Sequence, residues 1–313
     1  MKTTASPTVD AADTVMLPAP RSTFAIWSDL VKARLTFLVL LTTLAGFYAA
    51  VEGPTDWILL AHTLLGTALV ACGASALNQW WEREHDARMT RTETRPLPSG
   101  EMQPTTVLVA GGLLSIVGLI YLALLVNLLT SLLGAFTLLS YVLVYTPLKR
   151  ITTLNTAIGA IPGALPPLMG WSAVRDNVSR EGWALFAILF FWQLPHFLAI
   201  AWLYREEYAK AGFAMLPGRD PEGVRTGRQA ISHTLGLIAV SVCPSILTSG
   251  PGTLPVAGTV YFFGALLLGL AFLWCAIQFS RDMSRARARR LFFASILYLP
   301  LLLGLMALDK VRH

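Results

Sequence analysis

Long apolar segments recur along this chain and constrain its fold more than any other feature. A helix needs about 20 predominantly apolar residues to cross roughly 30 Å of hydrocarbon. Hydrophobic residues make up 55% of the 313 and charged residues only 13%, unlike an ordinary soluble domain. Nine segments are candidate spans: roughly 35–51, 57–80, 105–125, 128–146, 152–174, 182–203, 231–249, 257–279 and 291–308. The sequence therefore predicts an all-α membrane protein, a bundle of about nine transmembrane helices.

The first residues differ in composition from everything that follows. They contain Pro7, Pro18 and Pro20 among small polar side chains, without an apolar core, which is typical of a disordered tail and not of a cleaved signal peptide. We expect residues 1–22 to be a disordered cytoplasmic tail and residues 23–313 to form one polytopic transmembrane domain. Asn127 is almost the only polar interruption between the third and fourth spans, where we expect a tight helical hairpin.

Positive charges are distributed unevenly between the two sides of the predicted bundle. Lys and Arg are held back on the cytoplasmic side while neighbouring spans insert. With the N-terminus inside, the outer side receives only four of the 24 basic residues, namely Arg175, Arg180, Lys310 and Arg312. We therefore expect a cell (inner) membrane protein with the N-terminus and the loops 81–104 and 204–230 in the cytoplasm and the C-terminus outside. The net charge of +6 reflects this topology and requires no nucleic-acid partner.

The first of these loops begins with an amide and two carboxylates spaced four residues apart, Asn78, Glu82 and Asp86. Four residues advance a helix by about 40° beyond one turn, so the three side chains share a stripe roughly 12 Å long. Oxygen ligands arranged in this way can hold Mg²⁺ and leave coordination positions for a substrate diphosphate. The alternative is a solvated loop in which mixed charges merely end a hydrophobic helix.

Basic and acidic residues elsewhere in the two loops fit the same chemistry. Arg88, Arg91 and Arg95 follow the stripe, and guanidinium groups suit phosphate oxygens. In the second loop, Glu206 and Glu207 are candidates for a second set of metal oxygens facing the stripe. The alternative for that loop is an interfacial helix end in which Glu206 pairs with Lys210. A metal-diphosphate site at a membrane surface is the leading interpretation.

Four motifs of this chain occur together. The first is Asn78-x₃-Glu82-x₃-Asp86 followed by Met89-x-Arg91-Thr92-x₂-Arg95-Pro96-Leu97. The others are Tyr145-Thr146-Pro147-Leu148-Lys149-Arg150, the Gly- and Pro-rich run from Asn155 to Trp171, and Pro195-His196-Phe197 continuing to Glu207-Tyr208-x₂-Ala211-Gly212. Together they resemble the UbiA-type intramembrane prenyltransferases, and within that family the protohaem IX farnesyltransferase (haem O synthase) branch. The resemblance runs from about Leu30 to the C-terminus. It departs at Lys32-Ala33-Arg34, where many relatives read Lys-Pro-Arg, and at Glu207, where they have Asp.

The resemblance implies a farnesyl transfer from farnesyl diphosphate to the vinyl group of protohaem IX (haem b), with addition of water, giving haem O and diphosphate. Mg²⁺ is then the cofactor, haem b is a substrate, and a haem A synthase is a candidate partner. The candidate metal ligands are Asn78, Glu82, Asp86, Glu206 and Glu207. The candidate catalytic residues are Asn78, Glu82, Asp86, Arg91, Arg95, Lys149 and Arg150. The candidate substrate-binding residues are Lys32, Arg34, Arg88, Asn155, His196 and Tyr208.

Two features of the spans have alternative interpretations. His196 lies about 10 Å below the cytoplasmic end of its span by helical rise, where an imidazole can ligate haem iron or orient a propionate, or simply pack with a hydrogen bond. The Gly and Pro residues of span 152–174 indicate either a broken helix that lines a cavity or close helix packing through small residues.

Three other functions remain open. A UbiA-type enzyme that prenylates an aromatic acid or quinone precursor would carry the same carboxylates. A transporter would bury ionisable residues near the bilayer midplane, whereas here they gather at one face. A haem-binding electron-transfer subunit would need paired histidines on facing helices, and the spans offer isolated ones.

Overall fold

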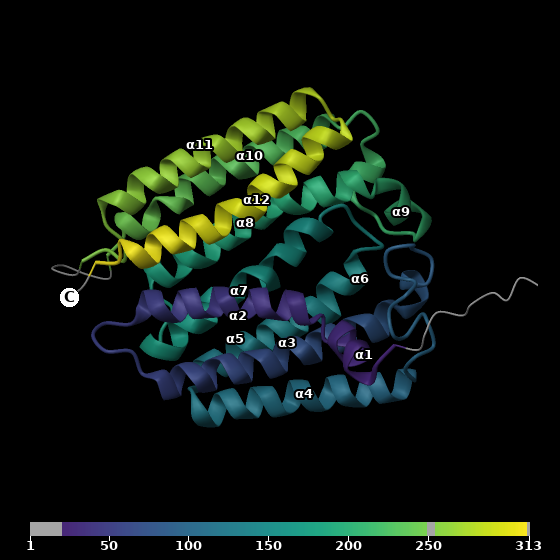
Figure 1. Cartoon of the computed structure of the whole chain (residues 1–313), viewed down its shortest axis with the longest axis horizontal. Helices are drawn as coiled ribbons and strands as arrows, with labels where there is room; N and C mark the ends of the chain where they lie inside the picture. The colour runs from purple at the N-terminus through teal and green to yellow at the C-terminus, as the bar shows by residue number, and fades with distance from the viewer. Residues whose placement is uncertain (1–20, 249–253, 312–313) are drawn as a thin grey trace, which may run out of the picture.

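Long helices lie side by side with nearly parallel axes in the computed structural model, which describes residues 21–248 and 254–311 (Figure 1). They are α2 (Ala33–Ala50), α3 (Trp57–Asp86), α4 (Pro104–Leu125), α5 (Leu128–Leu139), α7 (Asn155–Arg175), α8 (Arg180–Leu203), α10 (Val224–Ser241), α11 (Thr259–Arg281) and α12 (Arg285–Leu308). Shorter helices connect them: α1 (Thr23–Leu30), η1 (Ser140–Tyr145), α6 (Thr146–Leu148), α9 (Arg205–Lys210), η2 (Leu216–Arg219) and η3 (Cys243–Ser245). The predicted all-α class is confirmed. The predicted tail lies outside the described residues except for Arg21 and Ser22, and Ser22 caps α1.

Eight helical segments of the described chain are long and apolar enough to cross a membrane, with α5, η1 and α6 counted together as Leu128–Leu148. The ninth long helix, α10, packs between α8 and α11. It begins at Val224, earlier than the predicted span 231–249, and its first turns carry Arg225 and Arg228. This polar start lowers the hydropathy of α10 below that of its neighbours. Among the described residues, eight of the nine predicted spans therefore correspond to helices long and apolar enough to cross a membrane, and the ninth, α10, is amphipathic.

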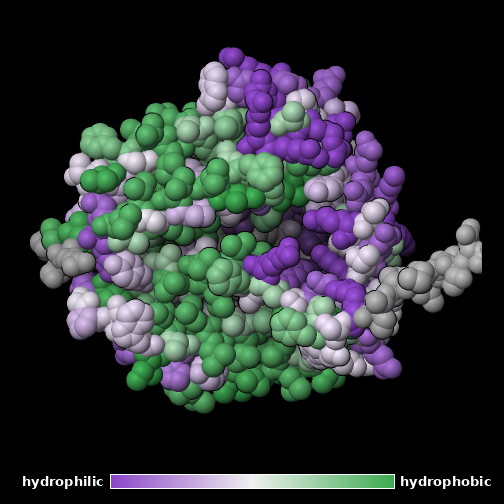
Figure 2. Space-filling view, in the orientation of Figure 1, coloured by the Kyte–Doolittle hydropathy of each residue, from purple (hydrophilic) through white to green (hydrophobic). Residues whose placement is uncertain are grey.

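The surface divides into an apolar body and a polar end. Large apolar side chains such as Leu124 and Leu267 are 77% and 71% exposed along the helices, as expected where lipid is the solvent. Figure 2 shows hydrophobic residues over the body and hydrophilic ones gathered at the end where α9 and the loop after α3 lie. The same view shows a hollow between the two halves of the bundle near this polar end.

The bundle has two halves, one with α1 to α5 and one with α8 and α10 to α12 (Figure 1). Helix α7 joins them, since it packs against α2 and α5 of the first half and against α8 of the second. It is a continuous helix of 21 residues despite Pro162, Pro166 and Pro167, so the broken-helix interpretation of this span is wrong. Close packing explains its glycines instead. A Cβ on Gly170 would overlap the Thr43 carbonyl of α2, and a Cβ on Gly46 would overlap the Pro167 carbonyl. The backbones of α2 and α7 are therefore in direct contact.

The predicted hairpin between the third and fourth spans is confirmed. Helix α4 ends at Leu125 and α5 begins at Leu128. Asn127 caps α5, because its Oδ1 accepts a hydrogen bond of 2.7 Å from the Thr130 N–H. Its Nδ2 donates to the Ser172 carbonyl of α7 at 2.8 Å. One polar residue thus ends one helix, starts the next and fastens the turn to α7.

The contact between α2 and α7 predicts a specific sensitivity to one added methyl group. Gly46→Ala should lower the free energy of unfolding by about 1–3 kcal/mol, because the new Cβ forces the two backbones apart. Gly304→Ala is the matched control, since that helical glycine of α12 has open space around its Cβ position. Thermal unfolding of the detergent-solubilised protein measures both. A Gly46→Ala variant as stable as the control would contradict the backbone contact.

Candidate active site

The acidic stripe is helical and buried. Helix α3 continues for 30 residues, about 45 Å, so its last turns carry Asn78, Glu82 and Asp86 beyond the length that a bilayer core requires. The three residues are only 0%, 4% and 2% exposed, respectively. The alternative of a solvated loop is therefore excluded.

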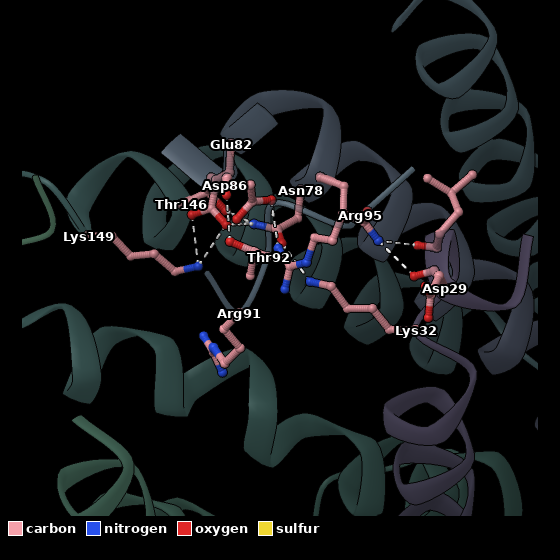
Figure 3. Close-up of polar contacts among 12 residues, drawn as sticks. Asp29, Lys32, Asn78, Glu82, Asp86, Arg91, Thr92, Arg95, Thr146 and Lys149 are labelled. Carbon is pink, nitrogen blue, oxygen red and sulfur yellow. Dashed lines mark hydrogen bonds and ion pairs between the residues drawn. The ribbon is translucent and has the colours of Figure 1, made fainter. Parts of the chain in front are cut away.

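Glu82 holds the centre of a hydrogen-bonded cluster (Figure 3). Lys149 Nζ donates to Glu82 Oε1 at 2.8 Å and to Oε2 at 3.1 Å. Asn78 Nδ2 donates to Glu82 Oε2 at 3.0 Å and to Thr146 Oγ1 at 3.1 Å. Burial by itself lowers the pKa of Lys149, but the Glu82 carboxylate raises it above its ordinary value. The Glu82 carboxylate therefore favours the charged form of Lys149.

A local irregularity brings Lys149 to the stripe. Residues Ser140–Tyr145 form a π-helix, η1, before the short helix α6, and π-helical turns occur frequently at functional sites. The Tyr145 ring centroid then lies 4.6 Å from Lys149 Nζ. Gly159 of α7 makes room for this ring, since a Cβ there would overlap it. The wider π-helical turn and the absence of a side chain at Gly159 together allow Tyr145 and Lys149 to lie beside the stripe.

Asp86 has its own basic partner. Arg95 Nη1 donates to Asp86 Oδ2 at 2.6 Å, and Arg95 is partly buried with it. Thr92 Oγ1 donates to the Asp86 carbonyl at 2.8 Å, which folds the loop after α3 back over the end of the helix. The two acids of the stripe thus pair with bases from two different segments.

Lys32 approaches the stripe from α2 in an unusual backbone conformation. Its φ of 48° and ψ of 55° are left-handed, which costs a non-glycine residue about 1–2 kcal/mol. Its Nζ donates to Asn78 Oδ1 at 2.7 Å. Burial and the nearby charges of Arg95 and Lys149 lower the pKa of Lys32 to about 7. Strained residues of this kind persist where the surrounding structure holds them, commonly at functional sites.

The two predicted loops meet at the polar end of the bundle. His85 Nδ1 lies 3.0 Å from the Ala211 carbonyl, and Met89 is buried with Ala211 and Phe213. Arg91 Nη2 donates to Tyr208 Oη at 3.0 Å. Residues separated by more than a hundred positions in the sequence therefore form one wall of the site.

The acids of the second loop lie apart from the stripe. Glu206 and Glu207 line a cavity of about 340 Å³ together with Trp202, Met283 and Arg285. Glu207 Oε2 is buried and has no hydrogen-bond partner among the described residues, so it is free to accept a cation. No three acidic, histidine or cysteine side chains of the described chain come close enough to form a metal site by themselves. The expected joint cluster with Glu82 and Asp86 is therefore not assembled.

The donor set of the stripe nevertheless fits Mg²⁺. Two carboxylates and an amide oxygen lie on one helix face, and Mg²⁺ prefers one or two carboxylates plus substrate phosphates and water over a complete protein cage. The residues that would hold the ion are Asn78, Glu82 and Asp86. Glu207, with its unpartnered oxygen, is the candidate from the second loop.

The remaining predicted residues fall into four groups. Arg150 Nη1 contacts His85 Nε2 at 2.9 Å beside the cluster, whereas Arg34 and Arg88 are exposed. Asn155 is buried and donates to the Thr152 and Ala214 carbonyls at 2.7 and 2.9 Å, so it ties α7 to the second loop. His196 belongs to the α8–α12 interface, where Ser295 Oγ lies 2.7 Å from its Nδ1. Its ring stacks against Trp192 and Phe292, which is the packing alternative.

Sequence reasoning missed the neutral residues that support the charged ones. Gln79, Thr92, Thr146 and Tyr145 all contact or position the cluster. Thr92, Thr146 and Tyr145 stand inside the quoted motifs, but their types carry no specific chemical signal. Gln79 follows Asn78 directly, so it points to a different helix face and falls outside the stripe.

Comparison with known proteins identifies the family. The model of the UbiA prenyltransferase family matches residues 39–297. This chain belongs to the UbiA prenyltransferase family. Among curated UbiA relatives, the protoheme IX farnesyltransferase of Solibacter usitatus (strain Ellin6076) is 46% identical over 291 residues, 90% of this chain and 97% of the relative. The protoheme IX farnesyltransferase of Myxococcus xanthus (strain DK1622) is 44% identical over 285 residues, 90% and 94% of the two chains.

Solved structures confirm the UbiA fold. A digeranylgeranylglyceryl phosphate synthase aligns with a TM-score of 0.75 at 16% identity, covering 91% of this chain and 98% of the other. A UbiA homologue from Archaeoglobus fulgidus bound to DMAPP and Mg²⁺ aligns with a TM-score of 0.67 at 14% identity, covering 90% and 99%. The chain is therefore a multi-pass membrane protein and a prenyltransferase.

The cluster predicts which basic residues matter for prenyl transfer. Lys149→Met and Arg95→Met should each lower kcat/KM by ~10²-fold or more, because each removes a cation that faces the stripe in a site poor in water. Arg287→Met is the control, since Arg287 lies in the first turn of α12 and its ion-pair partner, Asp282 at 3.7 Å, is not part of the stripe. Steady-state prenyl transfer measures all three. Equal, small losses would mean that these bases serve topology alone.

Proposed function

We propose that this protein is a protohaem IX farnesyltransferase, which transfers the farnesyl group of farnesyl diphosphate to a vinyl group of haem b and forms haem O. The observation that carries the proposal is the buried Asn78–Glu82–Asp86 stripe with Lys32, Arg95 and Lys149 converging on it. The names of relatives up to 46% identical, which align over nearly their whole length, supply the substrates.

The acid–base pairs of the site, Glu82 with Lys149 and Asp86 with Arg95, can exchange their partners for those of a bound substrate complex. A diphosphate brings negative oxygens for Lys32, Arg95 and Lys149, and these bases then leave the acids free to hold Mg²⁺. Bound Mg²⁺ would neutralise charge on the leaving diphosphate. The A. fulgidus homologue bound to DMAPP and Mg²⁺ supports this assignment by its fold. Arg91, held against Tyr208, is a further diphosphate candidate at the rim.

Ionisation of the allylic diphosphate leaves a carbocation that must meet the acceptor before water. The Tyr145 ring beside Lys149 offers a π face, which stabilises a nearby cation. The cluster is buried under the folded-back loop after α3, and this limits water at the bond that breaks. A vinyl carbon of haem b then forms the bond to farnesyl C1, and water adds to the resulting porphyrin-side cation with loss of a proton.

Two alternatives have less support. An aromatic acid or quinone precursor as acceptor fits the same diphosphate site, and the names of the relatives disfavour it. A transporter needs ionisable groups near the bilayer midplane, whereas the described ion pairs of the site gather at one end of the helices. His196 remains a candidate haem residue, although its contacts with Ser295, Trp192 and Phe292 favour packing.

A product assay tests donor and acceptor together. Purified protein incubated with haem b, Mg²⁺ and farnesyl, geranyl or geranylgeranyl diphosphate should yield a haem whose mass increases by one farnesyl unit plus water, with farnesyl as the preferred donor. Removing Mg²⁺ with a chelator should abolish the product. Prenylation of 4-hydroxybenzoate instead of haem b would move the protein to the alternative class.

The membrane orientation is also part of the proposal. The positive-inside distribution places the N-terminus, the active-site loops and the start of α12 in the cytoplasm of an inner membrane, with the C-terminus outside. Residues 23–313 would then form one polytopic domain. A haem A synthase would be the partner that takes the product.

Cysteine labelling checks this orientation. Glu93 is exposed in the loop after α3, so Glu93→Cys in a protein without Cys72, Cys243 and Cys275 should react with a membrane-impermeant maleimide only from the cytoplasmic side. Asp176→Cys, in the turn between α7 and α8, is the control and should react only from the outer side. Labelling of position 93 from outside would reverse the topology.

A further inference from the structure

Gln79 is a fully buried amide that the mechanism above does not use. Its Nε2 donates to the carbonyls of Asp29 and Leu30 at 2.9 and 2.8 Å, and its side chain is 0% exposed. These carbonyls belong to the last turn of α1, where a helix leaves its C=O groups without intrahelical partners. Gln79 therefore binds, from α3, two carbonyls at the end of α1, and the Asp29 carbonyl also accepts a hydrogen bond of 3.1 Å from the Lys32 N–H.

The turn that Gln79 holds is the one that carries Lys32. Val31 follows Leu30 directly, and Lys32 then adopts its left-handed conformation and caps the N-terminus of α2. A β-carbon disfavours this conformation, so the turn needs support from outside. Two adjacent residues of α3 provide it. Asn78 Oδ1 accepts from the lysine ammonium, and Gln79 binds the backbone just before it.

We propose that Gln79 is a positioning residue that fixes the Asp29–Lys32 turn and thereby aims the Lys32 ammonium at the diphosphate site. The proposal rests on the proposed function, in which Lys32 binds the leaving diphosphate. Both donor contacts of Gln79 are to backbone carbonyls of this turn, and its buried Oε1 has no hydrogen-bond partner among the described residues. The positioning role requires that its effect on prenyl transfer pass through Lys32.

This dependence makes a double-mutant cycle decisive. Gln79→Leu keeps approximately the size of the side chain and removes both donors, so kcat/KM for the prenyl diphosphate should fall about tenfold. Lys32→Met should lower it by ~10²-fold. The double variant should be no worse than Lys32→Met alone, because Gln79 has nothing left to position.

Gln193 provides a matched control. It is buried like Gln79, and its Nε2 also donates to two backbone carbonyls, those of Ala160 and Leu189, at 2.8 and 3.1 Å. It lies at the α7–α8 interface and not beside Lys32. Gln193→Leu should change kcat/KM by less than about twofold, and its effect should multiply with that of Lys32→Met, as for independent sites.

A second readout does not depend on activity. Acetic anhydride modifies free lysine amines, and the rate at Lys32 can be followed by mass spectrometry of the modified peptide. Gln79→Leu should raise the modification rate at Lys32 several-fold, because the turn no longer holds the amine in its hydrogen bond to Asn78. The rate at Lys149 should stay unchanged and serves as an internal reference. Gln193→Leu should leave both rates unchanged. If Gln79→Leu does not accumulate, Gln79→Asn serves instead, since its amide is one methylene too short to reach both carbonyls.

The outcomes separate the positioning role from the function on which it rests. If the losses from Gln79→Leu and Lys32→Met multiply and Lys32 labelling is unchanged, the positioning role is overturned. If Lys32→Met leaves kcat/KM unchanged, the diphosphate role of Lys32 fails. In that case, faster labelling in Gln79→Leu still supports the held turn, and an unchanged rate overturns it.

Discussion

The buried ion pair between Glu82 and Lys149 is the interaction on which the polar end of the bundle depends. Removing two charges from water costs several kcal/mol each, and their attraction repays this only with good geometry and further hydrogen bonds. The structure supplies both through Asn78, Thr146 and the short distances between the charged atoms. The long helix α3 carries Glu82 to the polar end of the bundle, and the π-helical turn η1 directs the chain that carries Lys149 toward it.

The same balance explains how a charged site is kept intact before substrate arrives. Each acid of the stripe has a basic partner from another segment, Lys149 for Glu82 and Arg95 for Asp86. Without this pairing, the two acids would repel each other, the two bases would repel each other, and the unpaired charges would draw water into the bundle. Paired, they hold the loop after α3 and the end of α6 close to the stripe. In a metal-diphosphate complex, the metal ion would pair with the acids and the diphosphate with the bases. The complex can therefore replace the internal ion pairs without leaving a charge uncompensated.

Periodic features of the fold and site were predictable from the sequence, and non-periodic ones were not. Apolar runs gave the helices, the spacing of Asn78, Glu82 and Asp86 gave the stripe, and Asn127 marked the hairpin. The early start of α10 was missed because Arg225 and Arg228 interrupt the apolar pattern. The sequence left the broken-helix and close-packing interpretations of α7 open because three prolines usually break a helix, and the structure shows the close packing. Pairings between distant segments, such as Gln79 with the turn before Lys32, depend on packing that no local pattern encodes.

The glycine contacts between α2 and α7 have a mechanical consequence. Side chains can change rotamer and let helices slide, but a backbone carbonyl seated where Gly46 and Gly170 lack side chains has no such freedom. Helices α2 and α7 are therefore expected to move together as one rigid unit. Helix α2 packs much less closely against α12 and α8 than against α7, and Figure 2 shows a hollow near the polar end of the bundle. Lys32 immediately precedes α2, so any movement of the α2–α7 pair would move this lysine with it.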